Sequence, residues 1–300
     1  MAGHESAKAI YYALFANLGI AIAKGIAAII TQSGSMLAET IHSLADCTNQ
    51  VLLLFGIKRA TLPPDESHPL GYGKDIYFWS FIVAMLLFSV GGLFSVYEGI
   101  HKLHVHEPIQ KVWLALTVLG FSIILECSSL FGALAEIKKI RKDKSFRHWF
   151  KTTRSSELVV VLGEDIAAVL GLVTAFIFVV LSHVLGDPVY DALGSIFIGV
   201  ILLIVSFFLI IRMKDLLIGK SADPDIQLAI RNHIDSDPNI EDVFNIITVQ
   251  LGPYIMLAGK IKLKGTLDIT TACNAVNRLE VSLKKHIPQI KWCFIEPDIV

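Results

Sequence analysis

The sequence predicts a membrane protein: an all-α bundle of six transmembrane helices, followed by a small cytosolic α/β domain of αββαβ order with a ferredoxin-like fold. Two observations predict this class. Hydrophobic residues make up 54% of the 300 residues, above the roughly 45–50% of a soluble domain. They gather in long segments before residue 213, and beyond that point the apolar density falls sharply.

Six segments are long enough to cross a bilayer, because a helix of about 20 apolar residues spans a hydrocarbon core of ~30 Å. We expect them to form a transmembrane domain over residues 1–212. The expected helices lie at about 9–31, 35–57, 76–99, 112–137, 156–184 and 189–212. The first is too long to be the apolar core of a cleavable signal peptide, so we expect it to remain as an anchor.

Basic residues predict the orientation. The segment from Lys138 to Arg154 is rich in Lys and Arg and contains a single acid, Asp143. Because such loops stay on the cytoplasmic side, we expect this loop and both termini in the cytoplasm, with the loop near anionic lipid. A bacterial inner membrane suits a short chain with minimal termini. The formal net charge of -1 gives no reason to expect a nucleic-acid partner.

Residues 213–300 are expected to form a cytosolic dimerisation domain. Cap and turn residues mark its elements. These are a helix after Asp223, strands at 244–251 and 255–263 around a Gly252-Pro253 turn, a helix of about 18 residues after Asp268, and a strand at 290–295. A domain this small has a marginal core alone, so it would gain stability by dimerising.

The second expected helix carries ionisable residues on one face. His42 and Asp46 are four residues apart, so their side chains lie on the same side, one turn apart. An ionisable group inside a bilayer costs roughly 2.5–3.5 kcal/mol, so it serves a function or forms a buried pair. Glu39 shares this stripe and lies at a depth similar to that of Lys24 on the first helix. We predict that Lys24 and Glu39 form a structural ion pair.

The fifth expected helix offers Glu164 and Asp165. Asp46 lies about eleven residues, or roughly 16 Å, from one end of its helix, and Asp165 lies about ten residues, or roughly 15 Å, from the opposite end of its own. In a core of ~30 Å these depths coincide at the midplane. His42, Asp46 and Asp165 are therefore candidate ligands for Zn²⁺, Mn²⁺, Fe²⁺ or Co²⁺. Glu164 is a weaker candidate, because it lies ~100° around the helix from Asp165. The alternative is that these groups pair with each other and hold the bundle together.

Four strings, in this order, carry a resemblance to a known family. They are SGSMLAE (33–39), HPLGYGK (68–74), DPVYD (187–191) and LIG (217–219). With six helices and an αββαβ tail, the chain resembles the cation diffusion facilitator family, the zinc transporters that exchange divalent metal for protons. The resemblance implies a homodimer joined through its cytosolic domains and membrane helices, a tetrahedral mid-membrane site from helices two and five, and alternating access driven by proton exchange. It gives ligand roles to His42, Asp46 and Asp165.

The chain departs from the family at Val161, which stands where the family has a helix-five histidine and cannot bind metal or carry a proton. One of four expected ligands is therefore missing. Glu164, water or a neighbouring carboxylate could fill the place. An oxygen-richer site suits Mn²⁺ or Fe²⁺ better than a site with two histidines would, while His42 keeps Zn²⁺ a candidate.

Other metal sites of the family are incomplete in this sequence. Asp65 and His68 fit a secondary site after the second helix, but Tyr72 stands where a second histidine often occurs. In the tail, positions that often supply histidines hold phenylalanine, and His233 is isolated in the sequence. We therefore expect the tail to dimerise by packing, without a bridging pair of metal ions.

These features predict a secondary active transporter that exports a divalent transition metal, with Zn²⁺ the first candidate, in exchange for protons. Protons and metal compete for the same ligands, so low pH on the release side displaces the ion. The alternatives are a Mn²⁺, Fe²⁺ or Co²⁺ transporter of the same fold, and a metal-binding membrane protein that does not transport. We expect no enzyme and no prosthetic group, because the sequence has neither an H-E-x-x-H string nor a nucleophile motif. Lipid and a second copy of the chain are the expected partners.

Overall fold

The computed structural model describes residues 2–105, 109–141 and 143–299, with side chains from Asn17 onward. The chain forms two compact units, which we describe separately. The helical unit lies within residues 1–55, 79–143 and 157–212, and the sheet unit lies within residues 56–78, 144–156 and 213–300.

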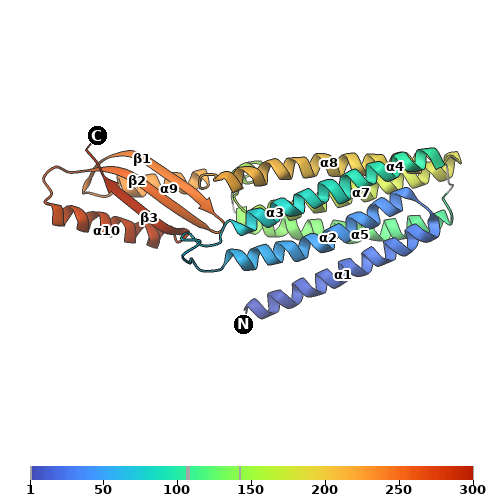
Figure 1. Ribbon diagram of the computed structural model, residues 1–300, viewed down its shortest axis with the longest axis horizontal. Coiled ribbons are helices and arrows are strands. Elements are labelled where there is room, and N and C mark those ends of the chain that lie inside the picture. Colours follow the sequence, from blue (N-terminus) through green and yellow to red (C-terminus); the bar gives the residue numbers. More distant parts are fainter. Residues whose placement is uncertain (1, 106–108, 142, 300) are drawn as a thin grey trace. The chain divides into compact units, whose positions relative to one another are not determined.

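Long helices account for most of the chain before residue 219. They are α1 (Ala2–Thr31), α2 (Gly34–Ala60), α5 (Val112–Arg141), α7 (Ser156–Leu185), α8 (Val189–Ile218) and one stretch formed by α3 (Asp75–Leu86), η1 (Leu87–Leu93) and α4 (Phe94–Val105). Figure 1 shows them running alongside one another. Within the described residues, these six stretches confirm the predicted bundle.

By length and composition, 4 described stretches could each cross a membrane: 75–105, 112–141, 156–185 and 189–218. The part of α1 with described side chains adds a shorter apolar helix, Asn17–Thr31. The remaining long helix, α2, carries buried Glu39, His42 and Asn49, which lower its apolar content. The protein is therefore a multi-pass membrane protein.

The third stretch is not a regular helix, contrary to the sequence prediction. Residues Leu87–Leu93 form a π-helical segment between α3 and α4. Glycines on this stretch allow close packing against α8: a Cβ added to Gly92 would lie 2.7 Å from the Leu203 side chain, and one added to Gly99 would lie 2.7 Å from the carbonyl oxygen of Ala192. Such long-range packing leaves no local pattern in the sequence.

The end of the chain has the predicted αββαβ order. The elements are α9 (Pro224–Asp235), β1 (Ile240–Leu251), β2 (Tyr254–Leu263), α10 (Ile269–His286) and β3 (Ile290–Pro297). The sheet has the order β1-β2-β3, with β1 antiparallel and β3 parallel to β2. The side chains of Asp223 and Asp268 cap α9 and α10 by accepting backbone N–H groups, as the sequence indicates.

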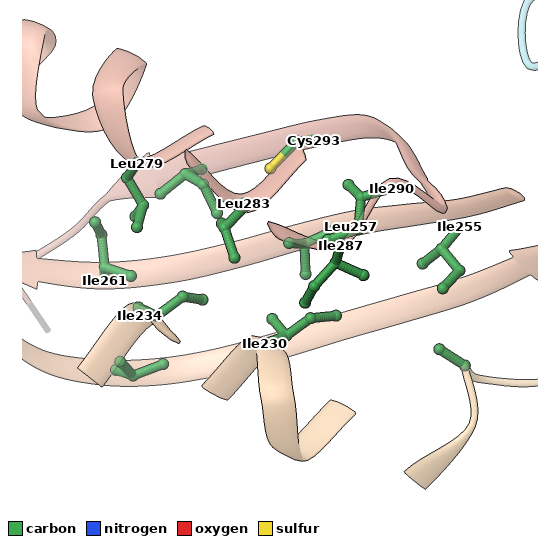
Figure 2. Close-up of a cluster of buried hydrophobic side chains, with 13 residues drawn as sticks. Ile230, Ile234, Ile255, Leu257, Ile261, Leu279, Leu283, Ile287, Ile290 and Cys293 are labelled. Carbon is green, nitrogen blue, oxygen red and sulfur yellow. The ribbon is translucent and has the colours of Figure 1, made fainter. Parts of the chain in front are cut away.

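Side chains from both helices and the sheet form the core of the sheet unit (Figure 2). Ile230 of α9, Leu283 of α10 and Leu257 of β2 are all fully buried. Burying one such side chain stabilises a fold by roughly 1.5–3 kcal/mol. Cys293 also lies in this core, and burial raises the pKa of its thiol to about 12. It is therefore a protonated, unreactive core thiol at neutral pH.

The sheet unit also includes part of the basic loop predicted to contact lipid, which forms the short helix α6 (Phe146–Thr152). Arg154 donates hydrogen bonds to the carbonyl oxygens of Ser221 and Ala222, at 2.7 and 3.4 Å. Lys144 forms an ion pair with Asp225. At least these two basic side chains contact protein.

Candidate metal centre

The helical unit contains a small cavity between α1, α2, α5 and α7. Its volume is about 70 Å³. The lining residues are Asn17, Ile20, Ser43, Asp46, Gln50, Glu126, Ser129, Val161, Glu164, Asp165 and Ala168. Four of these side chains are carboxylic acids, and they come from three helices. Val161, the residue that replaces the expected histidine, faces the same space.

Several buried polar atoms at or beside this cavity make no hydrogen bond with the described residues. His42 is fully buried beside it, with Nδ1 3.6 Å from Oδ1 of Asp46. Among the described residues, neither ring nitrogen of His42, nor Asp46 Oδ1, nor Asp165 Oδ2 has a hydrogen-bond partner. Buried polar atoms are almost always paired, and each unpaired one costs about 1–3 kcal/mol. These atoms are therefore available to a polar or cationic group in the cavity.

The structure thus places Asp46 and Asp165 on one cavity and His42 next to Asp46. Their side chains do not yet converge on one point. Across the described part of the chain, no group of three or more His, Cys, Asp or Glu side chains has the arrangement that holds a metal ion. Binding an ion between α2 and α7 therefore requires the side chains to move closer together.

Glu164 differs from its neighbour Asp165. Glu164 is buried, and its Oε1 accepts a hydrogen bond of 2.6 Å from Nδ2 of Asn49 on α2. Asp165 is half-buried, and its Oδ1 accepts a longer bond of 3.5 Å from the Ser129 hydroxyl on α5. Glu164 thus helps to join α2 to α7, whereas Asp165 keeps one oxygen free toward the cavity.

Glu126 is the site residue that the sequence analysis missed. It lies on α5 and contributes a half-buried carboxylate to the cavity. The signal was available, since an acid inside an apolar helix defaults to function or to a buried pair. The family resemblance implies ligands only on the second and fifth transmembrane helices, which are α2 and α7, and so it does not include α5.

Lys24 and Glu39 lie next to the cavity. Lys24 Nζ is 3.3 Å from Glu39 Oε2, and their side chains are 1% and 0% exposed. Lys24 also donates a hydrogen bond of 2.7 Å to the hydroxyl of Ser43, which lines the cavity. This is the pair that the depth argument expects.

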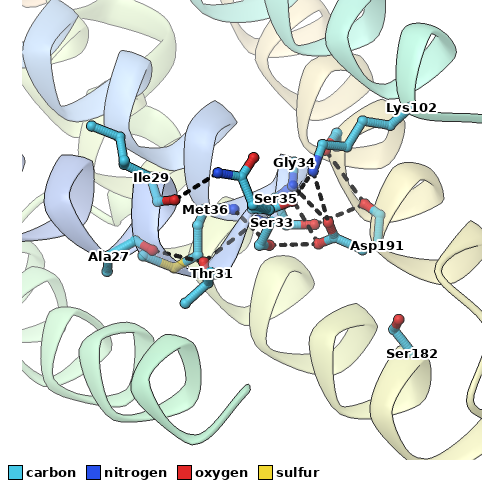
Figure 3. Close-up of polar contacts among 12 residues, drawn as sticks. Ala27, Ile29, Thr31, Ser33, Gly34, Ser35, Met36, Lys102, Ser182 and Asp191 are labelled. Atoms are coloured by element: carbon cyan, nitrogen blue, oxygen red, sulfur yellow. Dashed lines mark hydrogen bonds and ion pairs between the residues drawn. The ribbon is translucent and has the colours of Figure 1, made fainter. Parts of the chain in front are cut away.

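Two of the motif strings, SGSMLAE (33–39) and DPVYD (187–191), meet at the N-terminal end of α2 (Figure 3). The carboxylate of Asp191, in the first turn of α8, accepts hydrogen bonds from the Ser33 hydroxyl at 2.7 Å and from the Gly34 and Ser35 N–H groups at 2.6 and 3.2 Å. A carboxylate at a helix N-terminus pairs with N–H groups that have no partner within the helix. This contact holds the start of α2, the helix that carries His42 and Asp46, against the start of α8.

The residues proposed for a second metal site, Asp65 and His68, form hydrogen bonds within their own loop. Asp65 accepts hydrogen bonds from the Tyr72 hydroxyl at 2.5 Å and the His68 N–H at 2.7 Å. These donors, the Tyr72 hydroxyl first, lower the pKa of Asp65. In the tail, the sequence suggested that His233 is isolated, but the structure places it beside another histidine. Its ring lies 4.5 Å from that of His286, because α9 and α10 pack together.

The fold and the cavity define a multi-pass membrane protein whose helical unit contains a cavity lined by carboxylates. Residues 10–218 match the family described as the cation efflux transmembrane domain. The chain belongs to this cation efflux family, which confirms the resemblance found in the sequence.

Several relatives and solved structures are similar to the chain. The chain is 36% identical over 247 residues to the proton-coupled zinc antiporter SLC30A9, mitochondrial, of Xenopus laevis (82% of this chain, 43% of the relative). It is 24% identical over 300 residues to the manganese efflux system protein MneP of Bacillus subtilis (97% and 95%). The chain thus spans less than half the length of the zinc antiporter. The match to a solved structure titled MamM-CTD 215-293 covers 25% of this chain and 96% of the solved chain, with 13% sequence identity and a TM-score of 0.24.

Proposed function

We propose that the protein is a secondary active transporter that exports a divalent transition metal from the cytosol in exchange for protons, with Zn²⁺ as the first candidate cargo. The observation that supports this most directly is the set of buried, unpaired atoms on His42, Asp46 and Asp165 at one cavity. One imidazole and two carboxylates are donors that first-row divalent metals accept. Protons compete for the same atoms, so a proton gradient can drive release of the metal.

A second candidate cargo is Mn²⁺ or Fe²⁺. Four carboxylic acids and Val161, in place of a second histidine, line the cavity. Oxygen donors favour harder ions relative to Zn²⁺. The relative named as a manganese efflux protein agrees with this possibility. Co²⁺ transport by the same fold remains a further alternative.

The proposal extends to assembly and location. We propose a homodimer formed through the sheet unit and the membrane helices, with both termini on the cytoplasmic side of a bacterial inner membrane. The basic segment from Lys138 to Arg154 supports this orientation.

Transport into proteoliposomes tests the function. The purified chain is reconstituted with an acidic interior, and Zn²⁺ and Mn²⁺ uptake are measured against empty vesicles and against vesicles without a pH gradient. We expect uptake that depends on the gradient, loss of that uptake in Asp165→Asn, and no effect of Asp143→Asn, which makes the same chemical change at an exposed loop position. Wild-type flux no greater than that of empty vesicles would identify a protein that binds metal without transporting it. Full flux in Asp165→Asn would remove Asp165 from the site.

A further inference from the structure

We propose that Glu126 of α5 is the fourth cargo ligand, which supplies the donor that Val161 cannot. This inference rests on the proposed function, because it assigns a residue to the same metal site. It adds a third helix to a site that the sequence motifs place on α2 and α7 alone.

The first step is the position of Glu126. Its side chain lines the cavity together with those of Asp46, Asp165 and Val161. Ser129 lies three residues further along α5, so both residues lie on one face of the helix, about 4.5 Å apart along its axis. Because the Ser129 hydroxyl is 3.5 Å from Asp165 Oδ1, this face of α5 contacts Asp165 of α7 directly.

The second step is the lack of a structural role for the Glu126 carboxylate. Of the side chains that the structure describes, none forms a hydrogen bond or an ion pair with it. The nearby buried cation, Lys24, is bound to Glu39 and Ser43. An acid in an apolar helix either pairs or serves a site. Fully buried His42 lies beside the same cavity, next to Asp46, and neither of its ring nitrogens has a hydrogen-bond partner among the described residues. A bound cation would satisfy both residues.

The third step is the chemistry of the donor set. With Glu126, the site offers one imidazole nitrogen and carboxylate oxygens from three helices. A site with two histidines and two aspartates favours Zn²⁺, whereas one histidine with three carboxylates shifts the preference toward Mn²⁺ and Fe²⁺. Glu126 is therefore expected to set metal selectivity as well as affinity.

Metal binding to the full chain in detergent tests this assignment. Zn²⁺ and Mn²⁺ affinities are measured by competition with a fluorescent chelator for wild type, Glu126→Gln, Val161→His and the double variant. We expect Glu126→Gln to weaken Mn²⁺ binding at least about tenfold, since even an outer-shell partner contributes that much to metal affinity. The double variant should recover Zn²⁺ affinity but not Mn²⁺ affinity. The matched control is Glu136→Gln, an exposed acid on the same helix whose partner is Lys139.

The outcomes separate this inference from the proposed function. If wild type binds neither metal, the proposed function fails. If Asp165→Asn abolishes binding but Glu126→Gln keeps wild-type affinity for both metals, the function stands and the assignment of Glu126 is overturned. Should Glu126→Gln not fold, Glu126→Asp is measured instead, because it keeps the charge and withdraws the carboxylate by one methylene. Weaker Mn²⁺ binding then supports the proposal, and unchanged affinities overturn it.

Discussion

Replacing Lys24 by methionine should strongly destabilise the protein. The Lys24 and Glu39 side chains are 1% and 0% exposed, with 3.3 Å between Nζ and Oε2. Without Lys24, the Glu39 carboxylate would remain buried and unpaired. Breaking a buried pair in this way costs about 3–5 kcal/mol, or roughly two to three and a half orders of magnitude in the unfolding equilibrium. Glu39→Gln in the Lys24→Met background removes the uncompensated charge and should restore most of the loss.

The assay is unfolding of the full chain in mixed detergent micelles, followed by tryptophan fluorescence. Lys139→Met is the control, because it breaks an exposed pair with Glu136 that should contribute less than about 1 kcal/mol. In transport assays, Glu39→Gln should leave the ratio of Zn²⁺ to Mn²⁺ uptake unchanged. The reasoning is refuted if Lys24→Met is as stable as Lys139→Met, or if Glu39→Gln changes selectivity without changing stability.

Three further predictions concern the frame of the site and the tail. Asp191→Asn removes the charge that accepts the N–H groups of α2, so we expect a loss of about 2 kcal/mol, seen as a lower thermal midpoint; an unchanged midpoint would contradict it. Leu283→Ala leaves a cavity in the sheet unit and should cost about 2–5 kcal/mol, measured as faster amide exchange in β2, whereas wild-type protection there would exclude a core role. Burial first, and then nearby His286, lower the pKa of His233. The unfolded state therefore binds more protons, so the stabilisation is complete above the unfolded pKa of about 6.5 and is lost as pH falls through the folded pKa. The protection factors of the α9 amides, which are corrected for the pH dependence of intrinsic exchange, should fall on acidification in wild type but much less in His233→Gln, and an equal fall in both would refute this cause.

Much of the fold could be predicted because its signals are local. Length and apolar composition indicate the bundle, and Asp268 marks the start of α10 because its side chain accepts the Thr271 N–H. The π-helical segment Leu87–Leu93 could not be predicted in this way. It includes Gly92, which packs closely against Leu203 of α8, and such a long-range contact leaves no local pattern in the sequence. The pairing of His233 with His286 depends in the same way on the packing of α9 against α10.

The site was only half predictable for a related reason. Spacing places His42 and Asp46 on one face of α2, and depth places Asp165 level with them, but neither argument says which helix lies beside α7. In the structure α5 takes that position, and so Glu126 reaches the cavity. Helix adjacency in a bundle is a tertiary property, whereas the spacing of residues along one helix is a local one.

The polar residues of α2 differ in whether they contact other helices, and this difference bears on the role of the helix. Glu39, His42, Asp46 and Asn49 follow one another at intervals of three or four residues and so form one stripe. The two end members have partners on other helices: Glu39 contacts Lys24 of α1, and Asn49 donates to a carboxylate of α7. Between them, His42 has no hydrogen-bond partner for either nitrogen among the described residues, and Asp46 has none for Oδ1. Each end member also has one buried oxygen without a hydrogen bond, Glu39 Oε1 and Asn49 Oδ1. The difference is that each end member also contacts another helix, whereas the printed contact of His42 with Asp46, at 3.6 Å, stays within α2. Because Asp46 lines the cavity, the part of the stripe that does not join α2 to another helix is also the part that a ligand in the cavity would reach.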